Sequence, residues 1–191
     1  MPCKNCELKP VIKLPNSNIY QCKKCFNRYF EKDSMSTLYI LNKMLKPQNI
    51  KLIAISIDEG IEGYRKLDFL ENFCKENNIE LKVFSYEKEF GKTLDKMLKI
   101  TNERPCSICG VFRRYLLNTK AKQLGVTKLA TGHNLDDEAQ TILMNQFRRN
   151  VAASTRLGPI TGVIKDERFI RRIKPLYFMT EREVATFAFI N

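Results

Sequence analysis

The stretch KLIAISIDEGIEGYRKLDFLENFCKENNIELKVFS, residues 51–85, decides the fold class. Its two ends, 51–57 and 79–85, are short apolar runs of the kind that form buried strands. Between them, residues 64–78 place four apolar side chains on one helical face: Leu67, Leu70, Phe73 and Cys74. Cys74 is therefore expected in the core rather than at a metal site. A strand, a helix and a second strand predict an α/β fold with a parallel sheet covered by helices, whose ligands bind at the carboxyl ends of the strands.

The rest of the chain continues this alternation. Apolar spacing predicts helices over 34–45, 91–100, 106–125 and 136–147, and a short strand over 127–131. Around the last helix, five residues are spaced to face the core: Leu135, Ala139, Ile142, Leu143 and Phe147. We therefore expect one α/β domain over residues 31–191, preceded by a small separate unit at residues 1–30.

Four of the seven cysteines lie in the N-terminal unit, where they form two CxxC pairs separated by 15 residues: Cys3, Cys6, Cys22 and Cys25. Four thiolates satisfy the tetrahedral preference of zinc and leave no open position. The spacing therefore predicts a structural zinc ribbon, which would fold a segment that has too little core of its own. A chance cluster of cysteines is the alternative.

The net charge of +12 indicates an anionic partner such as nucleic acid, although a solvated basic surface would have the same composition. The candidate phosphate contacts are concentrated toward the C-terminal side: Arg148, Arg149, Arg156, Arg168, Arg171, Arg172 and Lys174. No segment approaches the roughly 18 to 20 apolar residues of a membrane span, and the N-terminus lacks the apolar region of a signal peptide. We therefore expect a cytoplasmic protein with no membrane partner.

Two turns at predicted strand ends contain unusual residues: DEGIEGYR, 58–65, and TGHNLDDEAQT, 131–141. In the second turn Asn134 can cap the following helix, whose first turn holds three acids, Asp136, Asp137 and Glu138. Capping explains one or two of these acids. Three carboxylates beside a glycine and a histidine also suit a site that holds Mg²⁺ against nucleotide phosphates or polarises a nucleophile, so both roles stay open.

A third cysteine pair, Cys106 and Cys109, lies in RPCSICGVFRRYLLN, residues 104–118. The amide donors at the start of the predicted helix and the nearby Arg104, Arg113 and Arg114 would favour thiolates. Two cysteines cannot complete a closed zinc site, so they could form a redox pair, transfer sulfur, supply part of an iron–sulfur cluster, or be incidental.

Taken in order, these motifs and the short KDS at residues 32–34 resemble the tRNA 2-thiouridine synthetases of the PP-loop ATP pyrophosphatase superfamily, the TtuA-type group and its wobble-uridine relatives. The resemblance covers nearly the whole chain. It implies a Rossmann-like domain that adenylates the 2-oxygen of a tRNA uridine with ATP and Mg²⁺ and then replaces that oxygen with sulfur. It also implies a ubiquitin-like carrier or sulfide as sulfur donor, a [4Fe–4S] cluster held by three cysteines, and a homodimer.

The resemblance assigns roles to individual residues. Asp137 matches a catalytic acid or base, and Arg113 matches a cation that stabilises the transferring group. Eight positions match nucleotide-binding residues: Lys32, Asp33, Ser34, Ser56, Ile57, Asp58, Gly132 and His133. Cys106 and Cys109 match catalytic and cluster-binding cysteines, and the tRNA contacts would come from Arg148, Arg149, Arg156, Arg171 and Arg172.

The sequence departs from the family pattern in two places. The family's phosphate loop reads SGGKDS after a first strand, whereas here Phe30 and Glu31 stand directly before KDS, and their side chains would obstruct the close backbone approach of a phosphate. The chain also stops before the family's third cluster cysteine. Three interpretations therefore stay open: an ATP-dependent tRNA uridine 2-sulfurtransferase, intact or impaired; a catalytically dead zinc-ribbon tRNA-binding protein; and a truncated gene product of such an enzyme.

Overall fold

A computed structural model describes the backbone of residues 12–13, 20–21, 23–61, 67–101, 105–161 and 168–190. Side chains are described from Lys32 onward within these ranges, except that of Cys106. At the N-terminal end, β1 (Ile12–Lys13) pairs antiparallel with β2 (Tyr20–Gln21). Cys3, Cys6 and Cys22, and the side chain of Cys25, lie outside the described residues, so the zinc ribbon stays a prediction.

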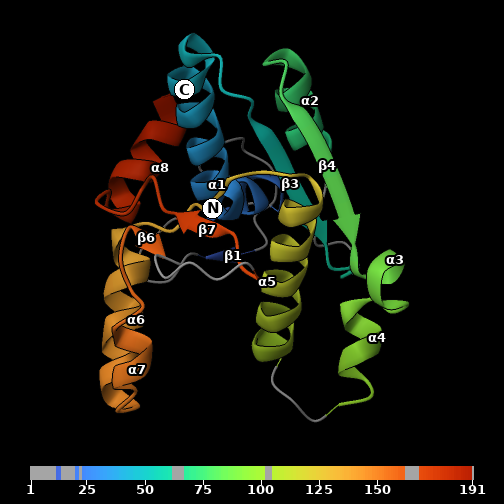
Figure 1. Cartoon of the computed structure of the whole chain (residues 1–191), viewed down its shortest axis with the longest axis vertical. Helices are drawn as coiled ribbons and strands as arrows, with labels where there is room; N and C mark the ends of the chain where they lie inside the picture. Colours follow the sequence, from blue (N-terminus) through green and yellow to red (C-terminus); the bar gives the residue numbers. More distant parts are fainter. Residues whose placement is uncertain are drawn as a thin grey trace.

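The predicted strand–helix–strand unit is confirmed. β3 (Ile53–Asp58) and β4 (Glu80–Ser85) are parallel and lie side by side in Figure 1, with α2 (Asp68–Glu76) between them in the chain. Cys74 of α2 is buried in one core cluster with Ala54 and Ile79. Its predicted core position is therefore confirmed, and burial raises the pKa of its thiol.

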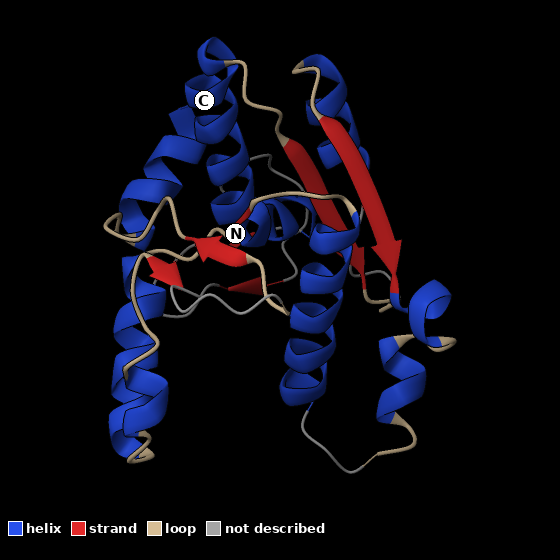
Figure 2. Cartoon of the chain, viewed as in Figure 1, coloured by secondary structure: helices blue, strands red, loops and turns tan. Residues whose placement is uncertain are grey.

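A second sheet contains β5 (Lys128–Ala130), β6 (Ile160–Thr161) and β7 (Arg171–Ile173). β7 is central, parallel to β5 and antiparallel to β6. Within the described ranges no ladder of hydrogen bonds joins this sheet to β3–β4, and Figure 2 shows the strands as two separate groups. The α/β class with parallel strands and flanking helices is confirmed, but the sheet is divided into two parts.

Three helices surround the carboxyl ends of β3 and β4: α3 (Tyr86–Phe90), α4 (Leu94–Leu98) and α5 (Pro105–Gln123). Ile57, Tyr86, Leu94 and Leu116 form the second core cluster, so β3, α3, α4 and α5 share one interior. Gly125 follows α5 with φ of +66°, as expected for a glycine that ends a helix. The long helix predicted over 106–125 is therefore confirmed.

The prediction that the apolar residues of α6 (Leu135–Phe147) face the core is wrong. Leu143 is 52% exposed and Phe147 is 84% exposed, and the other three members of this set are exposed as well: Leu135, Ala139 and Ile142. The physical reason is visible in Figure 1, where α6 and the short α7 (Val151–Ser154) extend away from the rest of the chain. No described helix combines the length and the hydropathy that a bilayer crossing requires.

The helix that contains KDS is longer than predicted. Residues 34–45 were expected to be helical, whereas α1 (Lys23–Leu45) begins well before KDS and is followed by the 3₁₀ turn η1 (Lys46–Gln48). α1 packs along α8 (Glu181–Ile190), and the rings of Tyr39 and Phe187 lie 5.7 Å apart in an edge-on arrangement. KDS therefore lies in the interior of a continuous helix, not at its beginning.

Candidate functional site

The loop after β5 lies directly on the backbone of α1. A Cβ atom at Gly132 would stand 2.8 Å from both the Asp33 carbonyl carbon and the Ser34 nitrogen, which is closer than real Cβ contacts. Only a glycine therefore permits this approach. Two motifs that are far apart in the sequence, KDS and GHNLDDE, thus meet in space, and three predicted nucleotide-binding residues lie together.

Asp33 presents an unusual carboxylate in this place. Its Oδ1 is buried and has no hydrogen-bond partner among the described residues. Burial raises the pKa of Asp33 above its ordinary 3.8; the negative charges of Asp137 and Glu181 add to the rise, while Lys32 and a hydrogen bond with Asn134 oppose it. An unsatisfied carboxylate oxygen near a second carboxylate has the chemistry of a divalent-cation ligand pair, so Asp33 and Asp137 fit Mg²⁺.

The predicted helix cap at Asn134 is confirmed. Asn134 Oδ1 accepts a hydrogen bond from the Asp137 N–H at 3.0 Å, and Asp137 Oδ2 accepts one from the Asn134 N–H at 3.1 Å. This capping box fixes the Asp137 carboxylate at the start of α6, on the side of Asp33. Capping and ligand binding are therefore compatible at Asp137.

The other two acids of the motif have their own partners. Asp136 Oδ2 accepts a hydrogen bond from the Glu181 N–H at 2.6 Å, and buried Glu138 forms an ion pair with Lys174. His133 is exposed, and its Nδ1 lies 3.0 Å from Thr131 Oγ1. Loss of water around its ring lowers the pKa of His133 from 6.5, so this histidine is neutral at pH 7.

Lys32 is not available to solvent. It is 6% exposed, and its Nζ lies 2.8 Å from Oε1 of Glu181 on α8. Sequence reasoning did not identify Glu181, because it lies 149 positions further along the chain and no local pattern marks it. Ser34, the third residue of KDS, is exposed.

A second polar group lies at the carboxyl end of β3. Glu59 is 1% exposed, and its Oε1 pairs with Arg113 Nη2 at 2.5 Å. The same guanidinium nitrogen lies 3.5 Å from Cys109 Sγ, to which it donates. The Tyr86 hydroxyl donates to the Cys109 carbonyl oxygen at 3.0 Å. The structure therefore brings together Arg113 and Cys109, two of the predicted catalytic residues, and adds Glu59, whose only sequence signal was an acid directly after a buried strand.

Charge and burial shift two pKa values in this group. Burial alone would lower the pKa of Arg113, but the Glu59 carboxylate and Cys109 outweigh it and raise the value. Burial, followed by the proximity of Cys109, raises the pKa of Tyr86. Arg113 therefore stays charged and Tyr86 stays neutral beside the sulfur.

The remaining predicted residues of β3 are placed as follows. Ser56 is buried, Ile57 packs in the core, and Asp58 Oδ1 accepts a hydrogen bond from the Gly60 N–H at 2.9 Å. Ile57 could therefore face a ligand only with its backbone. Arg172 of β7 contacts α5, since its guanidinium donates to the Arg114 carbonyl at 3.5 Å. Four of the five predicted tRNA contacts are exposed: Arg148, Arg149, Arg156 and Arg171.

The [4Fe–4S] cluster predicted at Cys106 and Cys109 stays a prediction, because the side chain of Cys106 lies outside the described residues. Cys109 Sγ is the one described sulfur of its pair, and the part of the chain that the structure covers contains no group of three or more histidine, cysteine or acidic side chains able to hold a metal ion.

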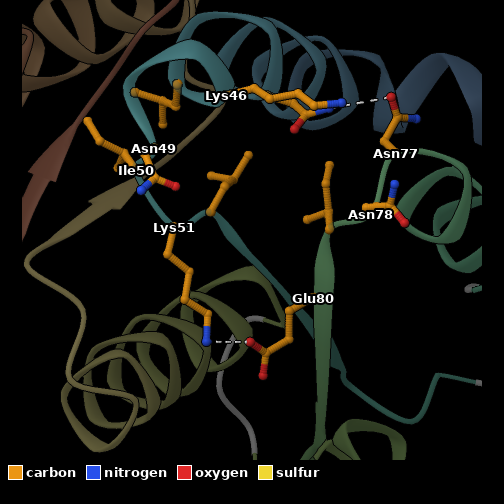
Figure 3. A pocket seen from close by; sticks show the side chains of 11 residues that line it. Lys46, Asn49, Ile50, Lys51, Asn77, Asn78 and Glu80 are labelled. Carbon is orange, nitrogen blue, oxygen red and sulfur yellow. Dashed lines mark hydrogen bonds and ion pairs between the residues drawn. The ribbon is translucent and has the colours of Figure 1, made fainter.

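Figure 3 shows a pocket of about 370 Å³ at the other end of β3 and β4. Asn42 donates to Asn77 there at 3.4 Å, and Lys51 pairs with Glu80 at 2.8 Å. None of the predicted site residues lines it, and ligands of open α/β sheets bind at the carboxyl ends of the strands, not at the amino ends. Asn78, which also lines the pocket, adopts a left-handed turn with φ of 55°, so a local structural role explains it.

The model of the PP-loop domain family matches residues 31–190. The chain belongs to the PP-loop family. Within it, the chain is 38% identical to a probable sulfurtransferase of Methanocaldococcus jannaschii and 33% identical to cytoplasmic tRNA 2-thiolation protein 1 of Danio rerio, over 92% and 99% of its own length. It spans only 60% and 64% of the length of these two relatives.

A solved structure shows the same fold. The U34-tRNA thiolase NcsA from Methanococcus maripaludis, solved with its [4Fe–4S] cluster, matches with a TM-score of 0.72 and 34% identity, over 100% of this chain and 72% of that one. The PP-loop fold expected from the motifs is therefore confirmed.

The comparisons also bear on the missing phosphate loop. The alignment with the M. jannaschii relative runs over 209 positions, more than the 191 residues of this chain, so that relative contains residues without a counterpart here. The family match begins at residue 31, immediately before KDS. The loss of a strand and its glycine loop ahead of Lys32 stays a prediction.

Proposed function

We propose that this protein catalyses ATP-dependent 2-thiolation of a tRNA uridine. The observation that supports it best is the contact between the Gly132 loop and the Asp33–Ser34 backbone, which assembles a carboxylate site from the two motifs that the resemblance assigns to the nucleotide. The names of the relatives, tRNA 2-thiolation protein and U34-tRNA thiolase, support the choice of substrate.

In the proposed reaction, Asp33 and Asp137 would hold Mg²⁺, which would neutralise negative charge on the ATP phosphates. The uridine 2-oxygen attacks the α-phosphorus and pyrophosphate leaves. Hydrosulfide then adds to carbon 2, AMP leaves with the 2-oxygen, and the proton of the hydrosulfide passes to solvent. Arg113, which Glu59 holds beside Cys109, keeps a positive charge at hydrogen-bond distance from the Cys109 sulfur. Cys109 and its partner Cys106 are proposed to carry the incoming sulfur.

Other features complete the proposal. The exposed arginines that follow α6 and α7, together with Arg171 of β7, contact tRNA phosphates, and the chain works in the cytoplasm. A zinc ion bound by Cys3, Cys6, Cys22 and Cys25 would fold the N-terminal unit of residues 1–30, which α1 joins to the domain at 31–191. Sulfur comes from a ubiquitin-like carrier or from sulfide, and two copies form a homodimer.

A second candidate function has its own support. Because α1 is continuous from Lys23, the amides of Lys32, Asp33 and Ser34 lie inside a helix, where N–H groups bond to carbonyls four residues earlier. Such amides cannot cradle phosphates as free amides at a helix N-terminus do. This geometry favours a tRNA-binding protein that has lost catalysis.

A thiolation assay distinguishes the two candidates. The full chain is incubated with tRNA, Mg²⁺–ATP and sulfide, and 2-thiouridine is quantified by mass spectrometry of the digested nucleosides. The first proposal predicts product that requires ATP, that disappears in Asp137→Asn, and that persists in Asp68→Asn, a control at an exposed position of α2. Salt-sensitive tRNA binding without any product would select the second candidate, and failure of both would reject both.

A further inference from the structure

The ion pair between Lys32 and Glu181 joins a buried cation to a solvent-exposed carboxylate. Lys32 is 6% exposed, whereas the side chain of Glu181 is 45% exposed. The ammonium is therefore neutralised inside the protein by a carboxylate that reaches it from the surface. Burial without such a partner would be costly for a lysine.

Glu181 is fixed by more than this pair. Its own backbone N–H donates to the Asp136 carboxylate at 2.6 Å, so one residue of α8 contacts both α1 and α6. These two helices supply Asp33 and Asp137, the carboxylates of the candidate site. The position of the Glu181 side chain is thus set by the same elements that form the site.

The charge around Lys32 opposes an arriving anion. The charge of Lys32 acts on the Asp33 carboxylate, its neighbour in the chain, and the Glu181 carboxylate lies 2.8 Å from the ammonium. Two carboxylates, those of Asp33 and Glu181, therefore act on one ammonium that is already paired. A polyphosphate can pair with the Lys32 ammonium only if the ammonium first separates from the Glu181 carboxylate.

We propose that Glu181 gates the site: it holds Lys32 in an internal ion pair, and nucleotide phosphates bind after Lys32 exchanges the Glu181 carboxylate for a phosphate oxygen. This inference rests on the proposed nucleotide binding at the Asp33–Asp137 site. It makes Glu181 a positioning residue that restrains affinity, not a group that touches the reacting atoms.

The test is the affinity of the full chain for Mg²⁺–ATP, measured by isothermal titration without tRNA. Glu181→Gln keeps the size of the side chain, its ability to accept from Lys32, and the backbone bond to Asp136, but removes the charge. Its dissociation constant should fall about tenfold, since a competing charge at hydrogen-bond distance is lost. Glu183→Gln is the matched control, because Glu183 lies on the same helix, bonds Thr180 and should leave the affinity unchanged.

Adding Lys32→Met to Glu181→Gln should abolish the gain. Equal affinities in wild type and Glu181→Gln would overturn the gate, and so would a weaker affinity. If no variant binds ATP, both the gate and the proposed function fail for this chain.

A second measurement distinguishes a failure of the gate from a failure of the proposed function. Acetylation of lysines by an amine-reactive ester, mapped by mass spectrometry, reports the accessibility of Lys32 without any nucleotide. Lys32 should be protected in wild type and in Glu183→Gln but become several-fold more reactive in Glu181→Gln. Rapid acetylation of Lys32 in the wild type would overturn the gate even if ATP binds.

Discussion

Gly132→Ala tests the contact on which the site depends. The new methyl group would lie 2.8 Å from two backbone atoms of Asp33 and Ser34 and 2.9 Å from the Asp33 carbonyl oxygen. Ordinary van der Waals contact begins near 3.4 Å, so the loop and α1 must separate by at least about 0.6 Å. Because the obstacle is helix backbone, no side-chain rotation can relieve the clash.

Overpacking of this kind costs about 1–3 kcal/mol. We expect Gly132→Ala to lower the free energy of unfolding by about 2 kcal/mol, measured as a lower urea midpoint at unchanged m-value, and to weaken ATP binding because Asp33 and Asp137 move apart. Gly132 has no positive φ, so the substitution tests the contact and not the backbone conformation.

Gly110→Ala is the matched control. Gly110 lies within α5, and a Cβ there would meet only the end of the flexible Arg114 side chain, at 3.2 Å. Alanine should leave stability unchanged or raise it by up to about 1 kcal/mol through helix propensity. An equal urea midpoint for Gly132→Ala and wild type would refute the proposed contact between the two motifs.

Three further outcomes follow from the structure. The folded state raises the pKa of Asp33 above its ordinary value of 3.8, so ionisation of this carboxylate costs stability as the pH rises from 3.8 through the folded pKa. Asp33→Asn should therefore increase the urea midpoint at pH 7. This gain should disappear near about pH 4. Glu59→Gln should destabilise by about 1–2 kcal/mol in thermal unfolding, discounted for the partial exposure of Arg113, and a double-mutant cycle with Arg113→Met should show coupling. Leu143→Asn should change the free energy of unfolding by less than about 0.5 kcal/mol, because the residue is half exposed, whereas Leu116→Ala in the core should cost about 2–5 kcal/mol; similar costs for both would contradict the placement of α6.

Local patterns predicted most of the fold. The apolar runs at 51–57 and 79–85 and the helical face that includes Cys74 predicted β3, β4 and α2, because side-chain periodicity and burial agree there. The same reasoning failed for α6, whose apolar face is exposed. Periodicity shows that a helix has an apolar face but not whether another element covers it.

The candidate site was predictable only in part. Asn134 and the acids after it gave a capping signal that the structure contains, and CSIC placed Cys109 near Arg113 on one helix. Glu181 and its pair with Lys32 could not be predicted, because the contact joins helices at opposite ends of the chain. The same holds for the continuation of α1 back to Lys23, since nothing ahead of KDS interrupts a helix once the glycines are absent.

The most direct test of the proposed site is to map the segments to which ATP binds. Photolabelling of the full chain with 8-azido-ATP and Mg²⁺, followed by peptide mapping, should place the adducts on segments 54–60 and 129–134, at the carboxyl ends of β3 and β5, and excess ATP should suppress them. Adducts confined to the Asn42–Lys51 and Asn77–Glu80 segments around the opposite pocket would contradict the proposed site.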